Sequence, residues 1–120
     1  MNYIIETNDI MRYNTCGDYY AINKYITKID IKRQLNEDYE FLIMIHELIE
    51  EHLTRKRGIK EEEIMKFDME WENRIDKVDE PGNQDDCIYK KEHRFAENIE
   101  RLICQELKID WFEYEKNLII

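Results

Sequence analysis

The spacing of apolar residues changes once along the chain, near residue 35, and this change constrains the fold more than any other feature. Before it, residues 25–31 are rich in branched side chains in partial alternation, and residues 3–5 and 13–20 are shorter segments of similar character. Branched and aromatic residues in alternation favour strands. We therefore predict three short antiparallel strands, with a turn at Gly17 and Asp18.

From Asn36 onward, apolar residues recur every three or four positions, which is the spacing of helices that bury one face. Asn36 is suited to cap a first helix that runs to about Arg57, and Gly58 is suited to end it. The expected inward residues include Phe41, Leu42, Ile45, Leu48, Ile49 and Leu53 on this helix.

The same spacing predicts a second helix over residues 60–75 and a third over residues 89–107. A polar loop at residues 79–86 separates them and is suited to shape one side of a pocket. Asp110 followed by Glu113 forms a capping box for a short last helix. The expected inward residues are Ile64, Phe67, Trp71 and Ile75, then Phe95, Ala96, Ile99, Leu102, Ile103 and Leu107.

These elements predict an α+β fold, in which a short N-terminal antiparallel sheet packs against three main helices plus a short C-terminal helix. A chain of 120 residues that is 42% hydrophobic has enough apolar material for one core, so residues 1–120 are expected to form a single domain.

Charge and cysteine content narrow the class of protein. A formal charge of -10 disfavours a nucleic-acid binder, because phosphate backbones are bound by clustered cations, and it favours a basic partner. Cys16, Cys87 and Cys104 lack the pairing of a disulfide framework and are expected to be free thiols. No segment approaches the length of a membrane span, so we expect a cytoplasmic protein without a membrane partner.

Several ionisable residues interrupt the predicted inward faces, and they are of metal-ligand types. Buried ionisable groups must be paired, hydrogen-bonded or metal-bound to be tolerated. His46 and Glu50 are four residues apart and are therefore neighbours on the first helix. The full set of potentially inward polar residues is His46, Glu50, Asp68, Glu92, His93 and Glu100.

Two histidines with carboxylates suit a divalent metal, zinc before other first-row ions. The predicted ligands are His46, Glu50, Asp68 and His93, with Glu47 as a catalytic base. The segment from His46 to Glu50 has the first two residues of a zincin helix motif, but Glu50 stands where that motif has its second histidine. The alternative is a metal-free network that ties the three helices together. His52, alone on the apolar face, is expected to be a satisfied core residue.

A series of short segments extends over most of the chain. In order, they are Arg12-Tyr13, Gly17-Asp18-Tyr19-Tyr20, Tyr39-Glu40-Phe41-Leu42, His46-Glu47-Leu48-Ile49-Glu50, Arg57-Gly58-Ile59, Phe67-Asp68, Glu80-Pro81-Gly82, Tyr89, Glu92-His93, Phe95-Ala96, Ile99-Glu100-Arg101 and Asp110-Trp111. Through their order and spacing, the chain resembles a family of small, uncharacterised phage and prophage proteins. The resemblance implies a phage setting in a host cell and no particular activity.

Two functions therefore follow as hypotheses, and whether the protein is an enzyme stays open. The first is a phage-type accessory protein with a divalent-metal site built from histidine and carboxylates on three helices. Such a protein would be a metal-dependent hydrolase, or a relic of one that still binds metal. The second is a metal-free acidic protein that binds and blocks or modulates a host factor. A nucleotide-processing enzyme is disfavoured, because the sequence has no glycine-rich phosphate loop.

Overall fold

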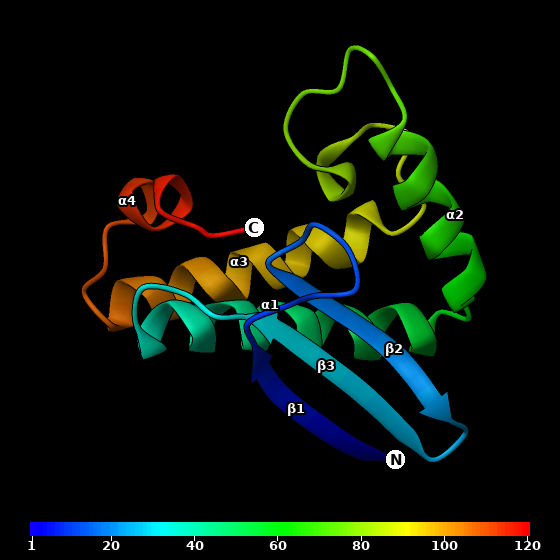
Figure 1. Ribbon diagram of the computed structural model, residues 1–120, viewed down its shortest axis with the longest axis horizontal. Coiled ribbons are helices and arrows are strands. Elements are labelled where there is room, and N and C mark those ends of the chain that lie inside the picture. Colours follow the sequence, from blue (N-terminus) through cyan, green and yellow to red (C-terminus); the bar gives the residue numbers. More distant parts are fainter.

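The computed structural model describes all residues 1–120, and its first third forms a three-stranded sheet. In this sheet the last strand of the sequence lies in the middle, in the order β1-β3-β2 (Figure 1). β2 is antiparallel to β3, whereas β1 is parallel to it. The strands are β1 (Asn2–Asn8), β2 (Gly17–Asn23) and β3 (Ile26–Lys32).

The sheet is therefore mixed, and the prediction that all three strands are antiparallel is wrong. The connection over residues 9–16 carries the chain past the end of β3, from one edge of the sheet to the other. β2 consequently runs opposite to β1, and β3, which follows after a tight turn at Lys24 and Tyr25, is parallel to β1. The turn expected at Gly17 and Asp18 is also absent, because both residues begin β2.

The helices follow the sequence pattern closely. The side chain of Asn36 accepts a hydrogen bond from the amide of Tyr39 at 2.9 Å, and Gly58 ends the first helix with a positive φ of 80°. Asp110 caps the last helix by accepting from the amide of Glu113 at 3.0 Å. The elements are α1 (Glu37–Lys56), α2 (Glu61–Glu72), the 3-10 helix η1 (Pro81–Asn83), α3 (Lys90–Glu106) and α4 (Trp111–Lys116).

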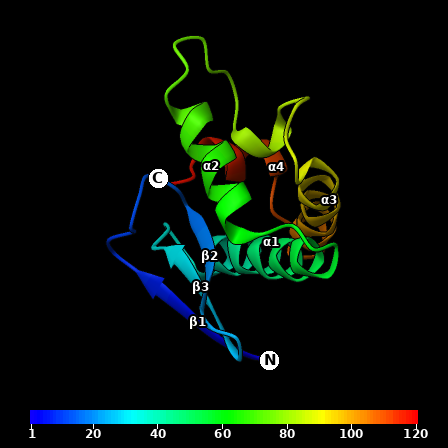
Figure 2. The same cartoon turned by 90° about the vertical axis from the view of Figure 1, so that its right-hand side faces the viewer.

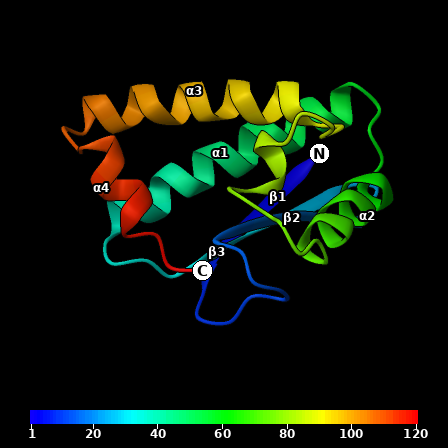
Figure 3. The same cartoon turned by 90° about the horizontal axis from the view of Figure 1, so that it is seen from above.

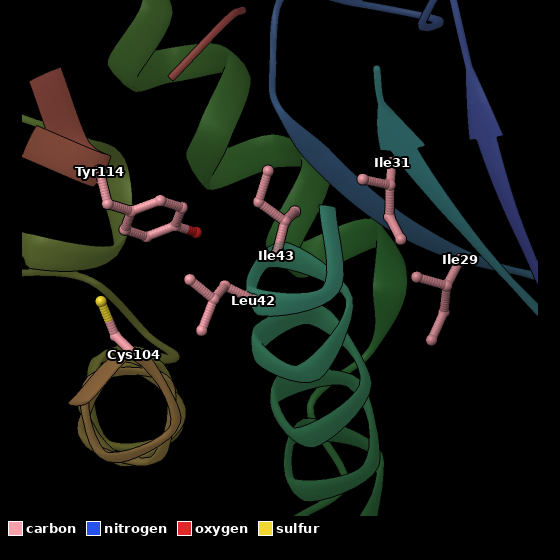
Figure 4. Packing of buried hydrophobic residues seen from close by; sticks show 6 residues of the cluster. All are labelled: Ile29, Ile31, Leu42, Ile43, Cys104 and Tyr114. Atoms are coloured by element: carbon pink, nitrogen blue, oxygen red, sulfur yellow. The ribbon is translucent and has the colours of Figure 1, made fainter. Parts of the chain in front are cut away.

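Helix α1 is the centre of the molecule, because it has the sheet on one side and α3 on the other (Figures 2 and 3). The two helices run antiparallel, and α4 lies near the end of α3 (Figure 3). This position explains why residues 41–45 are apolar on nearly every side. Figure 4 shows the resulting core on both sides of α1, formed by Ile29, Ile31, Leu42, Ile43, Cys104 and Tyr114.

Part of the predicted apolar face of α3 lies outside the core. Phe95 is 51% exposed and Leu102 is 61% exposed, because α1 and η1 pack on α3 from the opposite side. Ile75 is fully exposed beyond the end of α2, and His52 is exposed rather than in the core. The buried face of α3 instead carries mainly polar side chains, namely Glu92, His93 and Glu100, with Ala96 and Cys104.

Phe41 and Leu107, which were also expected to point inward, are 41% and 37% exposed. The three cysteines carry free thiols. None of the helices combines the length and the apolar character that crossing a membrane requires.

Candidate metal centre

Three ligand-type side chains meet in the interior between α1 and α3. His46 Nε2 lies 3.0 Å from Glu50 Oε2 and 3.2 Å from His93 Nδ1, and His93 Nδ1 lies 2.9 Å from Glu50 Oε2. All three residues are buried. Three coordinating atoms thus form a nearly equilateral triangle, in which each atom is a normal ligand of a first-row divalent metal.

The helix geometry explains how the triangle is assembled. His46 and Glu50 are one turn apart on α1, so their side chains lie side by side along the face that meets α3. The antiparallel packing of α3 brings His93 opposite Glu50, and places Glu100, two turns further along α3, opposite His46. The relative position of His46 and Glu50 is therefore set by α1 alone, whereas the position of His93 depends on how α3 packs against α1.

The second nitrogen of His46 faces a carboxylate. Its Nδ1 lies 2.7 Å from Glu100 Oε1, and the hydroxyl of Tyr114 donates to Glu100 Oε2 at 2.6 Å. With a proton on Nδ1, the lone pair of His46 Nε2 points at Glu50 and His93. A carboxylate behind a histidine in this way fixes the tautomer and raises the basicity of the ligating nitrogen at metal sites.

His93 has a similar arrangement. Its Nε2 lies 2.6 Å from Glu80 Oε1, and the contact is an ion pair rather than a hydrogen bond, because the oxygen lies away from the direction of the N–H bond. Gly82, two residues after Glu80, packs against the imidazole ring. A Cβ atom at Gly82 would be 2.5 Å from Cγ and Nδ1 of His93, so only glycine lets the loop approach this closely.

Glu50 is held by a third protein contact. The hydroxyl of Tyr19 on β2 donates to Glu50 Oε1 at 2.9 Å, which leaves Oε2 to face the two histidines. Burial alone would raise the pKa of Glu50, but hydrogen bonds from His46 and His93 outweigh burial and lower the pKa to about 2. Glu50 is therefore an anion throughout the physiological pH range.

The histidines are strongly basic in the metal-free protein. Burial lowers the pKa of each, but the hydrogen bonds and charges of Glu100 and Glu50 raise the pKa of His46 well above its ordinary value. The hydrogen bond to Glu50 and the negative charges of Glu50 and Glu80 likewise raise the pKa of His93 to about 10. Without a metal, two imidazolium rings with nitrogens 3.2 Å apart would face each other, and only the surrounding carboxylates would offset their repulsion.

A cavity of about 720 Å³ opens beside the triangle, which is within the usual size range of ligand sites. It lies between α1, α3, the start of β2, α2 and η1, and both Glu80 and Gly82 line it. The polar loop at residues 79–86 therefore shapes one side of a pocket, as the sequence predicts.

Glu47, the predicted base, lines the same cavity. Its side chain lies against Gly17, where a Cβ atom would be 2.6 Å from Glu47 Cγ and Oε1. Gly17 therefore leaves room for the Glu47 side chain, and it is not part of a turn. The Glu47 carboxylate has no hydrogen-bond partner, and burial together with the charge of Glu50 raises its pKa well above the ordinary value.

Asp68 is the one predicted ligand that the structure does not bring into the triangle. It lines the cavity and accepts a hydrogen bond from the hydroxyl of Tyr89 at 2.6 Å. Burial raises its pKa to about 6. Glu92 is buried but binds Arg57, whose Nη2 donates to Glu92 Oε2 at 2.8 Å, so this carboxylate joins the end of α1 to the start of α3.

Sequence reasoning missed several residues of the centre. The sequence pattern predicts Tyr19 and Tyr114 as core residues. No neighbouring residue in the sequence indicates that their hydroxyls reach Glu50 and Glu100. Glu80 lies in a segment without a periodic pattern. The only signal for Glu80 is its place beside Pro81 and Gly82 in the segments that carry the phage-family resemblance.

Comparisons with family models, with curated proteins and with solved structures find no match for this chain.

Proposed function

We propose that this protein is a zinc-dependent hydrolase whose metal ligands are His46, Glu50 and His93. The carrying observation is the triangle of ligand atoms, in which each histidine presents one nitrogen to the centre and the other to a carboxylate. In a tetrahedral site with bonds of about 2.0 Å, ligand atoms lie about 3.3 Å apart, and the three distances of 2.9, 3.0 and 3.2 Å need little adjustment to reach this value.

A set of three protein ligands suits a catalytic zinc site, which keeps a fourth position open for water. Bound zinc would supply a Lewis acid that polarises a carbonyl group and activates water. Glu47 follows the first ligand directly and lines the cavity without a hydrogen-bond partner, so it is available as a general base. Tyr19 and Tyr114 act indirectly, because they orient Glu50 and Glu100.

The metal-free alternative uses the same side chains as a hydrogen-bonded network. In that case the histidines are protonated, because the neighbouring carboxylates stabilise the imidazolium form. The protein then acts by binding a basic host protein through its acidic surface. The phage setting is compatible with both functions and remains part of the proposal. Metal content separates the two.

The first experiment is metal analysis by mass spectrometry on untagged protein. We expect close to one zinc ion per chain, with manganese or iron as substitutes, and loss of the metal in His46→Ala and His93→Ala. His52→Ala is the matched control, because His52 is exposed on the same helix and lies outside the triangle. Metal-free wild-type protein that also fails to take up added zinc would contradict the proposal.

The hydrolase part has a separate test. Glu47→Gln should keep the metal and lose hydrolysis of ester and amide substrates, because the amide side chain cannot accept a proton from water. If Glu47→Gln lost as much metal as His46→Ala and His93→Ala, Glu47 would stabilise the metal site rather than act as a base.

A further inference from the structure

The cavity beside the metal centre has a wall that is mainly apolar where it is accessible. His46, Glu50 and His93 all border this cavity, and other charged side chains do so as well, yet apolar atoms make up most of the surface that faces it. Ligand sites of this size are typically lined by apolar side chains, with a few polar groups that fix the orientation of the ligand. The wall therefore favours a ligand that is largely apolar.

Two methionines on α2 contribute to this wall. Met65 and Met69 are one turn apart, and both line the cavity. They lie outside the buried face of α2, which carries Ile64, Phe67 and Trp71, and they are 38% and 62% exposed. Helix α2 therefore buries one apolar face and presents a second, accessible apolar surface to the cavity. We call Met65 and Met69 the methionine pair.

The cations that border the cavity already have partners within the chain. Arg12 donates to Asp18 through both Nε and Nη2, at 2.5 and 3.1 Å. Lys77 Nζ lies 3.0 Å from Glu72 Oε2. All four residues border the cavity, so these opposite charges offset each other within the wall. No cation is left to bind a phosphate or carboxylate on a ligand, and the accessible apolar surface remains as the main contact.

We infer that the substrate is a small ester or amide with an extended apolar acyl group, and that this group lies against the methionine pair. The inference rests on the proposed function. In the reaction, the oxygen of water forms a bond to the acyl carbon, and the bond from that carbon to the leaving oxygen or nitrogen breaks. Glu47 passes a proton from water to the leaving atom. Methionine side chains are flexible and polarizable, so the pair can adapt to the shape of the acyl chain.

The test uses three hydroxamates, which bind zinc through the same group and differ only in the chain attached to it. These are acetohydroxamate, hexanohydroxamate and the hexano compound with an amine at its far end, each titrated calorimetrically into the zinc-loaded protein. We expect hexanohydroxamate to bind about thirtyfold more tightly than acetohydroxamate, because its four additional methylene groups are partly buried. The amine compound should lose most of this gain, since its ammonium group would have to be desolvated.

A double variant locates the apolar contact. Met65→Ser combined with Met69→Ser should reduce the preference for hexanohydroxamate over acetohydroxamate about fivefold. The zinc content and the affinity for acetohydroxamate should not change, because the methionine pair lies outside the ligand triangle. Leu102→Ser is the control, since Leu102 is a similarly exposed apolar side chain on α3 that does not line the cavity.

The outcomes separate the two proposals. Equal affinity for acetohydroxamate and hexanohydroxamate, tightest binding of the amine compound, or an unchanged preference in the double variant overturns the inference and leaves the hydrolase standing. Absence of zinc, or no binding of any hydroxamate to zinc-loaded protein, overturns the proposed function and the inference with it.

Discussion

At one end of the α1–α3 interface, Leu42 belongs to the same apolar cluster as Cys104 and Tyr114, and one turn further along α1, His46 meets Glu100. Both places are buried, and the same pair of helices builds both. We call them the apolar half, which contains Leu42, and the polar half, which contains His46, Glu50, His93 and Glu100. Figure 4 shows the first of these, with Leu42 directed toward Cys104 and Tyr114.

The two halves contribute to stability in opposite ways. Burying a Leu or Ile side chain stabilises the fold by about 1.5–3 kcal/mol relative to leaving it exposed. Burying a charged group costs free energy that hydrogen bonds and opposite charges must offset, and an apolar replacement is often as stable. Stability alone therefore does not explain the composition of the polar half.

The largest effect is expected from the apolar half. Leu42→Ala should lower the free energy of unfolding by about 2–5 kcal/mol, since it leaves a cavity in a fully buried position. The change should be measured by urea denaturation together with metal analysis, and the metal content should not change. Leu102→Ala, at an exposed position on α3, should change stability by less than about 0.5 kcal/mol. Loss of metal in Leu42→Ala would show that the two halves are not independent.

The next effect is the pH dependence of stability, which should have opposite signs in metal-free and zinc-loaded protein. In chelator-treated protein, the pKa of His93 is raised from 6.5 to about 10, so its contribution to stability is full below about pH 6.5 and is lost as the pH rises toward 10. In zinc-loaded protein the ligands must be deprotonated, so stability should instead fall as the pH drops below about 6.5. Urea denaturation across this range, with chelator and with zinc, measures both trends. Identical pH profiles would contradict a metal centre.

The smallest effect is expected at Tyr114, which belongs to both halves. Its ring packs in the apolar cluster, while its hydroxyl donates to Glu100. Tyr114→Phe keeps the ring and removes the hydrogen bond, so we expect a loss of about 1 kcal/mol in stability and about tenfold in zinc affinity. Competition with a chromogenic chelator measures the affinity. An affinity equal to that of wild type would show that Glu100 needs no support from Tyr114.

The helical part of the fold and half of the centre could be predicted because the signals are local. Asn36, Gly58 and Asp110 act within a turn of their own positions, and the structure confirms all three. His46 and Glu50 share a helix face through spacing alone. His93 was predicted from its place on α3, and the structure confirms that it meets the other two.

The remaining features depend on how distant segments pack. Whether β1 lies parallel or antiparallel to β3 is decided by the path of residues 9–16 around the sheet, and residue type does not encode that path. Phe95 is in phase with the other apolar residues of α3, such as Leu102, yet both are exposed because α1 and η1 pack on the opposite side of the helix. Asp68 has the chemistry of a ligand, but the position of α2 gives it Tyr89 as a partner instead.

The sequence by itself thus determined the helices, their caps and the placement of His46 and Glu50 side by side on one helix, since these follow from interactions over three or four residues. Only the tertiary structure decided that Glu100 and Glu80 lie behind the two histidines, that Tyr19 reaches Glu50, and that a cavity opens beside them. The physical reason is that these contacts join segments far apart in the chain, so their geometry exists only after α1, α3 and the sheet have docked.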